Sequence, residues 1–134
     1  MLPVTASTVR LFLHVLAATV WVGGQLTLLG LLPAARQLGG DATSRLARQF
    51  DRIAWPAFAV LVATGIWNLL AIDVGATSTE YQVTVLVKLL LVALTGGAAA
   101  IHRVAADKRV LAASGAAAGL AAIGAVFVGV LLAG

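Results

Sequence analysis

Two ionisable side chains that could do chemistry lie inside long apolar stretches of the chain. His14 lies seven residues after Ser7 in the first stretch, and Lys88 lies seven residues after Tyr81 in the third. An ionisable residue inside a membrane span costs roughly a few kcal/mol or more, so such residues are functional by default. A neutral imidazole can bind a metal ion or haem iron without adding buried charge, and a nearby ammonium group can pair with an anion such as a haem propionate. We therefore take His14 and Lys88 as the centre of a predicted site.

Further polar residues recur at helical spacing around this pair. In the first stretch His14, Trp21 and Gln25 fall on one helical stripe, and in the second Thr64 and Asn68 are four residues apart. The first and third stretches enter from the same side and the second returns to it, so Thr64 and Asn68 are expected at the depth of His14. The predicted cofactor-binding set is His14, Trp21, Gln25, Thr64, Asn68 and Lys88.

Each of these residues also has a plainer interpretation. Lys88 can extend its ammonium group toward the membrane surface. Gln25, Thr64 and Asn68 can simply hydrogen-bond neighbouring helices. Trp21 could belong to an aromatic belt, although it lies deeper than a belt residue should. These alternatives stay open at the level of the sequence.

The candidate metal ligands are His14 and His102, because the chain has no cysteine and its one methionine is Met1. Disulfides, iron–sulfur clusters and thiolate metal sites are therefore excluded. His102 lies beside Arg103 at the far end of the third stretch, where an interfacial histidine is also ordinary. Copper(I) pathways usually need thioether or thiolate ligands, so the composition disfavours high-affinity copper conduction.

The elements that could position these residues are helices that cross a membrane. The 134 residues are 61% hydrophobic and 10% charged, with a mean hydropathy of +1.04. A soluble domain has about 25% charged residues. A chain with this composition could not cover its own surface with polar groups, so its expected solvent is the lipid bilayer.

Four apolar segments are predicted to be transmembrane helices, at about residues 9–32, 53–72, 81–102 and 110–133. A helix of about 20 residues crosses a hydrocarbon core about 30 Å thick. Pro33 with Gly39-Gly40 marks the end of the first helix, and residues 43–52 are predicted to form an amphipathic interfacial helix that turns into the second span. Short loops make sequential helices antiparallel neighbours. The prediction is an all-α, integral membrane four-helix bundle with antiparallel, up-down topology, in a single domain over residues 1–134.

The basic residues predict how the chain is oriented. Seven of the nine lie in the first and third loops, on one side of the membrane: Arg36, Arg45, Arg48, Arg52, Arg103, Lys108 and Arg109. By the positive-inside rule that side is cytoplasmic. The expected protein is a multi-pass protein of the cell membrane with both termini on the extracytoplasmic side (N-out/C-out). Because the positive charge orients the chain, it predicts no nucleic-acid partner.

Three functions are compatible with these residues. Binding of haem b in the outer half of the bundle comes first, since glycines at 23–24 and 96–97 leave room for a planar ring. It would serve electron transfer to a membrane redox partner, and an enzyme of this kind would be a haem-dependent membrane oxidoreductase. Copper transport or homeostasis, with copper ion in place of haem, is the alternative. The third is a non-catalytic scaffold subunit, and the Gly115–Gly119 segment is compatible with a homo-oligomer.

The segment LHVLAATVWVGGQ, with His14, Trp21 and Gly23-Gly24, is similar to the first-helix pattern of the copper-resistance D (CopD) family. The segments RQFDRIAWPAFAVLVATGIWNLL and YQVTVLVKLLLVALTGGAAAIHR resemble that family's second and third helices, so the resemblance covers most of residues 10–105. It implies a membrane protein with a role in copper uptake or tolerance.

A weaker likeness extends to the HemJ-type protoporphyrinogen oxidases, which are small haem-b membrane proteins. It implies that His14 and Lys88 are the functional pair. The Leu-Pro-Arg segment that ends the first helix of that family is not reproduced here, because Pro33 is followed by Ala34 and Ala35. The likeness therefore implies a haem site rather than protoporphyrinogen oxidation.

Overall fold

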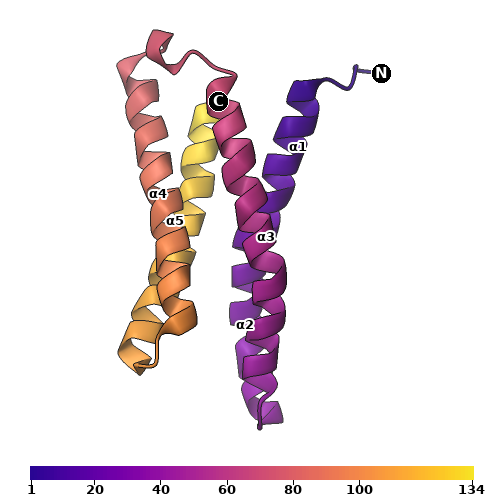
Figure 1. Ribbon diagram of the computed structural model, residues 1–134, viewed down its shortest axis with the longest axis vertical. Coiled ribbons are helices and arrows are strands. Elements are labelled where there is room, and N and C mark those ends of the chain that lie inside the picture. The colour runs from indigo at the N-terminus through magenta and orange to yellow at the C-terminus, as the bar shows by residue number, and fades with distance from the viewer. The chain divides into compact units, whose positions relative to one another are not determined.

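The computed structural model describes residues 1–134 and contains helices and no strands (Figure 1). The elements are α1 (Ala6–Ala18), the π-helix η1 (Thr19–Gly23), α2 (Gly24–Leu38), α3 (Ala42–Leu70), the 3-10 turn η2 (Val74–Ala76), α4 (Thr79–Val104) and α5 (Lys108–Ala133). The first three follow without a break as one helix, Ala6–Leu38. Four helices are thus long and apolar enough to cross a membrane. This confirms the all-α class and the four predicted spans of a membrane-embedded protein.

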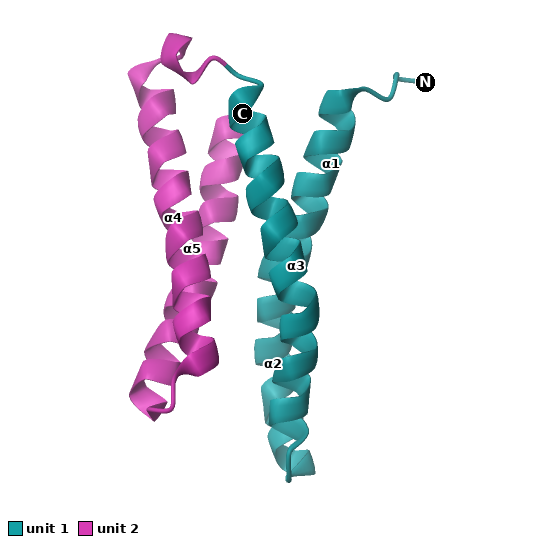
Figure 2. Ribbon diagram, viewed as in Figure 1, with its two compact units in different colours: residues 1–72 teal, residues 73–134 magenta.

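The chain divides into two compact units, residues 1–72 (unit 1) and residues 73–134 (unit 2) (Figure 2). Unit 1 is a hairpin of Ala6–Leu38 and α3, in which α3 packs along both α1 and α2. Unit 2 is a hairpin of α4 and α5, which pack along each other. In both units early residues of the first helix contact late residues of the second, so the two helices of each hairpin are antiparallel.

The turn of unit 1 depends on glycine. Gly39 and Gly40 have φ angles of 69° and 56°, in the left-handed region that favours residues without a Cβ. Gly39 ends α2, and α3 begins three residues later at Ala42. The two glycines therefore reverse the chain direction between the helices.

The structure refines two sequence-based expectations about unit 1. The first helix was expected to end at Pro33 with Gly39-Gly40; it passes Pro33, continues to Leu38 and ends at Gly39. Proline removes one backbone hydrogen bond and its ring crowds the carbonyl of the preceding turn, but the hydrogen bonds on either side carry the helix past it. Residues 43–52 are helical and belong to α3, which runs unbroken from Ala42 to Leu70; their place at the membrane interface stays a prediction. No glycine or proline lies within 43–52 to interrupt it.

The first helix contains a turn that the sequence did not predict. Residues Thr19–Gly23 form a π-helix between α1 and α2. This run combines β-branched residues with glycine, which are weaker helix formers than alanine or leucine. π-turns inside α-helices are frequent at functional sites. Here the turn carries Trp21, a residue that is only 2% exposed.

Unit 2 is held together by small residues. The buried side chains on its two helices are mostly alanines, threonine and serine: Thr95, Ala98, Ser114, Ala118, Ala121 and Ala122. Small residues allow two helix backbones to approach closely, as is common in membrane proteins. At the centre Thr95 Oγ1 donates a hydrogen bond of 2.7 Å to the Ala118 carbonyl. Large apolar side chains such as Leu90 and Phe127 are exposed instead, as expected when lipid surrounds the helices.

Candidate functional site

His14 is fixed by a hydrogen bond between the two helices of unit 1. Its Nδ1 lies 2.9 Å from Oγ1 of Thr64, which α3 presents from a buried position. The ring also lies against Gly65, where a Cβ atom would be 3.5 Å from His14 Cε1. Two residues of the predicted set, His14 and Thr64, are thus brought together as expected.

The bonds of Thr64 decide which nitrogen of His14 carries the proton. Thr64 Oγ1 lies 2.7 Å from the Val60 carbonyl and 3.1 Å from the Leu61 carbonyl, and it donates its single proton there. It can then only accept from His14, so His14 Nδ1 is the donor. In the neutral ring Nε2 therefore carries the lone pair. A histidine whose Nδ1–H is held by a protein oxygen in this way is preset to bind a metal through Nε2.

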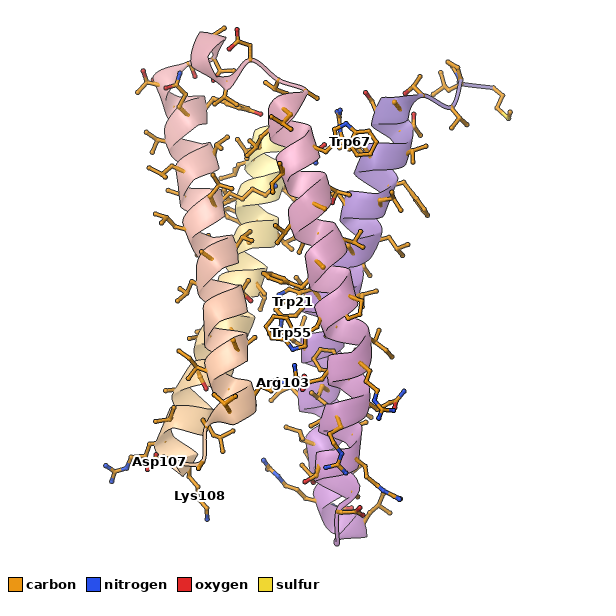
Figure 3. The ribbon with its side chains drawn as sticks, viewed as in Figure 1. Trp21, Trp55, Trp67, Arg103, Asp107 and Lys108 are labelled. Carbon is orange, nitrogen blue, oxygen red and sulfur yellow. The ribbon has the colours of Figure 1, made fainter.

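Trp21 packs in an aromatic cluster rather than in a belt at the membrane surface. Trp21 and Trp55 lie side by side (Figure 3), with ring centroids 5.6 Å apart in an edge-on arrangement. The Trp21 centroid also lies 4.4 Å from that of Phe58. Such pairs contribute about 0.5–1.5 kcal/mol each beyond their buried area. Trp21 lies two helical turns from His14, so we assign it to the packing of unit 1. Phe58 did not appear among the predicted residues.

Unit 1 also contains buried polar atoms without a hydrogen-bond partner. These are Arg10 Nε, Gln25 Nε2 and Asn68 Oδ1. Arg10 and Asn68 each lie one helical turn beyond the bonded pair His14 and Thr64, so they extend its two faces by one turn. Gln25 lies on α2, beyond the π-helix, and is not bonded to His14. Buried polar groups normally bond to protein, water or a ligand. These three atoms therefore mark positions in unit 1 where a water molecule or a ligand has room to bond.

Lys88 belongs to unit 2, where its side chain lies along α5. A Cβ atom at Gly129 would be 3.2 Å from Lys88 Nζ and 3.6 Å from its Cε. The missing side chain of Gly129 therefore makes room for the ammonium group of Lys88. Because His14 and Lys88 lie in different units, the pairing of the two stays a prediction.

His102 repeats the arrangement of His14 at the turn of unit 2. Its Nδ1 lies 2.8 Å from the Leu111 carbonyl, which can only accept. Nδ1 is therefore the donor, and Nε2 carries the lone pair of the neutral ring. The ring lies on Gly115, where a Cβ atom would be 3.1 Å from both Cε1 and Nδ1, and Ser114 Oγ is 3.4 Å from Nδ1.

No group of three or more His, Cys, Asp or Glu side chains that could hold a metal ion is present. Each histidine thus offers a single imidazole ligand, and the tautomer of each is set by a hydrogen bond within its own unit. The sequence identified both rings and, in Thr64, the oxygen that orients His14. It did not identify the Leu111 carbonyl that orients His102 or the Val60 carbonyl that accepts the Thr64 proton, because backbone carbonyls have no signature in residue type. Phe50 of α3 fills the space beside Gly24, a contact that the sequence did not predict.

Comparison with known proteins identifies the family. The family model described as "Copper resistance protein D" (CopD) matches residues 44–134, which is more than half of the chain, and the chain belongs to this family. No curated protein and no solved structure matches it. The match includes α3, α4 and α5, with Thr64, Lys88 and His102. Together with the four apolar helices it defines a copper-related, multi-pass membrane protein. The likeness to HemJ-type proteins stays a prediction.

Proposed function

We propose that the protein binds and passes on copper ions within the membrane, with His14 Nε2 as the principal ligand. One observation carries the proposal: Thr64 donates its proton to the backbone of α3 and accepts from His14 Nδ1–H, so Nε2 is the ring nitrogen that carries the lone pair. Imidazole is a suitable copper ligand. Membership of the CopD family supports copper as the ion.

His102 supports the same function as a second copper ligand. It lies within the family match, and the Leu111 carbonyl orients its Nε2 in the same way. The chain has no cysteine and no methionine other than Met1, so neither ligand is reinforced by the sulfur atoms that retain copper(I) tightly. Weak ligation by single imidazoles suits release and transfer of the ion better than storage.

Haem b at His14 is the second candidate, because an imidazole that coordinates through Nε2 is also an axial haem ligand. The room predicted for a macrocycle is smaller than the sequence indicated. At Gly24 a Cβ atom would be only 2.5 Å from Phe50 Cε2, so that space is already filled, whereas no atom lies within 4 Å at Gly23. This packing, and the family match, favour copper over haem.

The proposed setting is the cell membrane, with both termini on the extracytoplasmic side. Seven of the nine basic residues lie in the turns of the two hairpins or next to them, and the positive-inside rule assigns such turns to the cytoplasm. In this orientation His14, near the start of the first helix, lies in the outer half of the bilayer. His102, at the turn of unit 2, lies at the cytoplasmic surface.

A copper titration of the purified full-length protein tests the proposal. Copper(I) is added in competition with a chromophoric chelator to the wild type and to the His14→Gln and His102→Gln variants, and a visible spectrum is recorded for each. We expect copper binding that is mostly lost in His14→Gln and partly retained in His102→Gln, with no Soret band. Helical content from circular dichroism controls for folding.

Three outcomes would count against copper at His14. Copper binding that is equal in wild type and His14→Gln removes His14 as the ligand. A Soret band that disappears in His14→Gln establishes haem instead. If a folded preparation supplied with both copper and haem binds neither, the non-catalytic scaffold function is the one that remains.

A further inference from the structure

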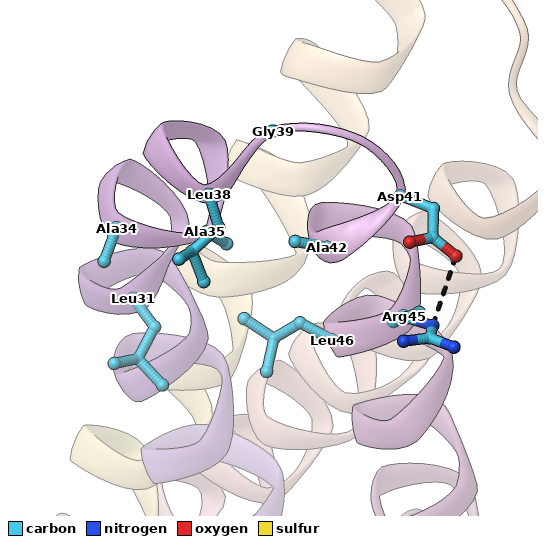
Figure 4. A pocket seen from close by; sticks show the side chains of 9 residues that line it. All are labelled: Leu31, Ala34, Ala35, Leu38, Gly39, Asp41, Ala42, Arg45 and Leu46. Atoms are coloured by element: carbon cyan, nitrogen blue, oxygen red, sulfur yellow. Dashed lines mark ion pairs between the residues drawn. The ribbon is translucent and has the colours of Figure 1, made fainter.

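We propose that the turn of unit 1 is a binding site for an anionic phospholipid, whose acyl chain lies in a groove between α2 and α3 and whose phosphate contacts Arg45. The groove has a volume of about 670 Å³ (Figure 4). Its lining residues are Leu31, Ala34, Ala35, Leu38, Gly39, Asp41, Ala42, Arg45 and Leu46. Ligand pockets are typically about 300–1,000 Å³, so the groove is large enough for a ligand.

The groove has an apolar part and a charged part, as a phospholipid has acyl chains and an ionic headgroup. Three leucines and three alanines supply an apolar wall from α2 and α3. Asp41 and Arg45 supply the only charged side chains, at the turn (Figure 4). An apolar wall that ends in a charged group fits a molecule with a hydrocarbon chain attached to an ionic headgroup.

The depth of the groove matches the lipid headgroups. The helix Ala6–Leu38 has 33 residues, which corresponds to about 50 Å, whereas a hydrocarbon core is about 30 Å thick. The helix is therefore longer than the core, and its charged end must lie outside the hydrocarbon. Arg36 and Arg45 mark this end, while Leu31 lies about one and a half turns further into the membrane.

The charge at this turn favours an anion. Four arginines, Arg36, Arg45, Arg48 and Arg52, lie within residues 36–52 against two aspartates, Asp41 and Asp51. All four arginines are exposed. Arg45 Nε is bonded to Asp41 at 3.1 Å, but the two side chains are 75% and 67% exposed. An ion pair this exposed is weak, so a phosphate can compete with Asp41 for the guanidinium group, which binds phosphates in bidentate fashion.

Native mass spectrometry of the purified full-length protein tests this site. The probe is an equimolar mixture of phosphatidylglycerol and phosphatidylcholine with identical acyl chains. We expect the wild type to retain phosphatidylglycerol preferentially. Arg45→Gln should reduce the preference about five-fold, the effect of one arginine near an anionic membrane surface. Asp41→Asn should increase it, because Arg45 is released from its ion pair.

Two further variants distinguish lipid binding in the groove from a general effect of positive charge on lipid retention. Ala34→Phe places a ring in the groove from an exposed position, so it should reduce retention of both lipids. Arg109→Gln removes a charge at the turn of unit 2 and is the matched control, which should leave retention unchanged. Excess inorganic phosphate should not displace the lipid, since it lacks a chain to bury.

The proposal is overturned if the wild type retains both lipids equally, or if Arg45→Gln and Arg109→Gln lose the same amount. It is also overturned if Ala34→Phe retains as much lipid as the wild type. A reduced preference in Asp41→Asn would contradict the role given to the ion pair. Because Asp41→Asn is expected to gain lipid, misfolding cannot imitate the expected result.

Discussion

The hydroxyl group of Thr64 should control how His14 binds copper, and the Thr64→Val variant tests this. Valine keeps the shape of threonine but removes the oxygen that lies 2.9 Å from His14 Nδ1. Hydrogen bonds between membrane helices contribute about 0.6 kcal/mol on average and about 1.7 kcal/mol at most, so unit 1 should remain folded. The ring then loses the partner that fixes its tautomer and orientation.

Loss of such an outer-shell partner typically lowers metal affinity about 10- to 100-fold. We therefore expect the copper Kd of Thr64→Val to rise by this factor in a competition titration with a chromophoric chelator. Thr64→Ser keeps the hydroxyl and should bind nearly as well as the wild type. In nitrogen-15 NMR of labelled histidine, the His14 signal should change from the Nδ1–H tautomer to a mixture in Thr64→Val only.

Thr27→Val is the matched control, because the Thr27 hydroxyl bonds to the Gly23 carbonyl of its own helix and is exposed. This variant should change neither the Kd nor the His14 signal. Equal copper affinity in wild type and Thr64→Val would refute the reasoning. So would a loss in Thr64→Ser as large as that in Thr64→Val, since the hydroxyl would then be irrelevant.

Two further predictions concern the packing of each hairpin. Gly24→Ala should destabilise unit 1 by about 1–3 kcal/mol in a denaturant titration, because its Cβ would be 2.5 Å from Phe50 Cε2; Gly23→Ala has nothing within 4 Å and should have little effect. Equal stability of the two variants would contradict this packing. Thr95→Val should destabilise unit 2 by about 0.6–1.7 kcal/mol, since it removes the 2.7 Å bond to the Ala118 carbonyl. Thr95→Ser should lose less, and a loss equal to that of valine would argue against the bond.

The spans and part of the site were predictable because they follow from hydropathy and helical spacing. Four long apolar stretches allow only helices in a bilayer, where backbone groups must bond internally. Polar residues on one stripe indicated that Thr64 would face the first helix, and it bonds to His14. The sequence therefore predicted Thr64 as the partner of His14 Nδ1. It could not predict the tautomer of His14, because this depends on the Val60 carbonyl, which accepts the proton of Thr64.

The exact helix boundaries were harder to predict, because local signals compete with the continuity of a helix. Of the two end signals in the sequence, Pro33 lies inside the helix and the glycines at 39–40 set its end. The charged segment 43–52 is typical of an interfacial helix, but it continues into α3 without a break. The π-helix at Thr19–Gly23 could not be predicted from the spacing of apolar residues, because a single π-turn inside a long helix leaves that spacing almost unchanged.

The hydrogen bonds inside each hairpin bear on how the protein enters the bilayer. Unit 1 bonds His14 to Thr64, and unit 2 bonds Thr95 to the Ala118 carbonyl, each within two consecutive helices. A polar side chain that meets hydrocarbon without a partner is costly. Each pair of helices can therefore be inserted as a unit during synthesis with these groups already bonded.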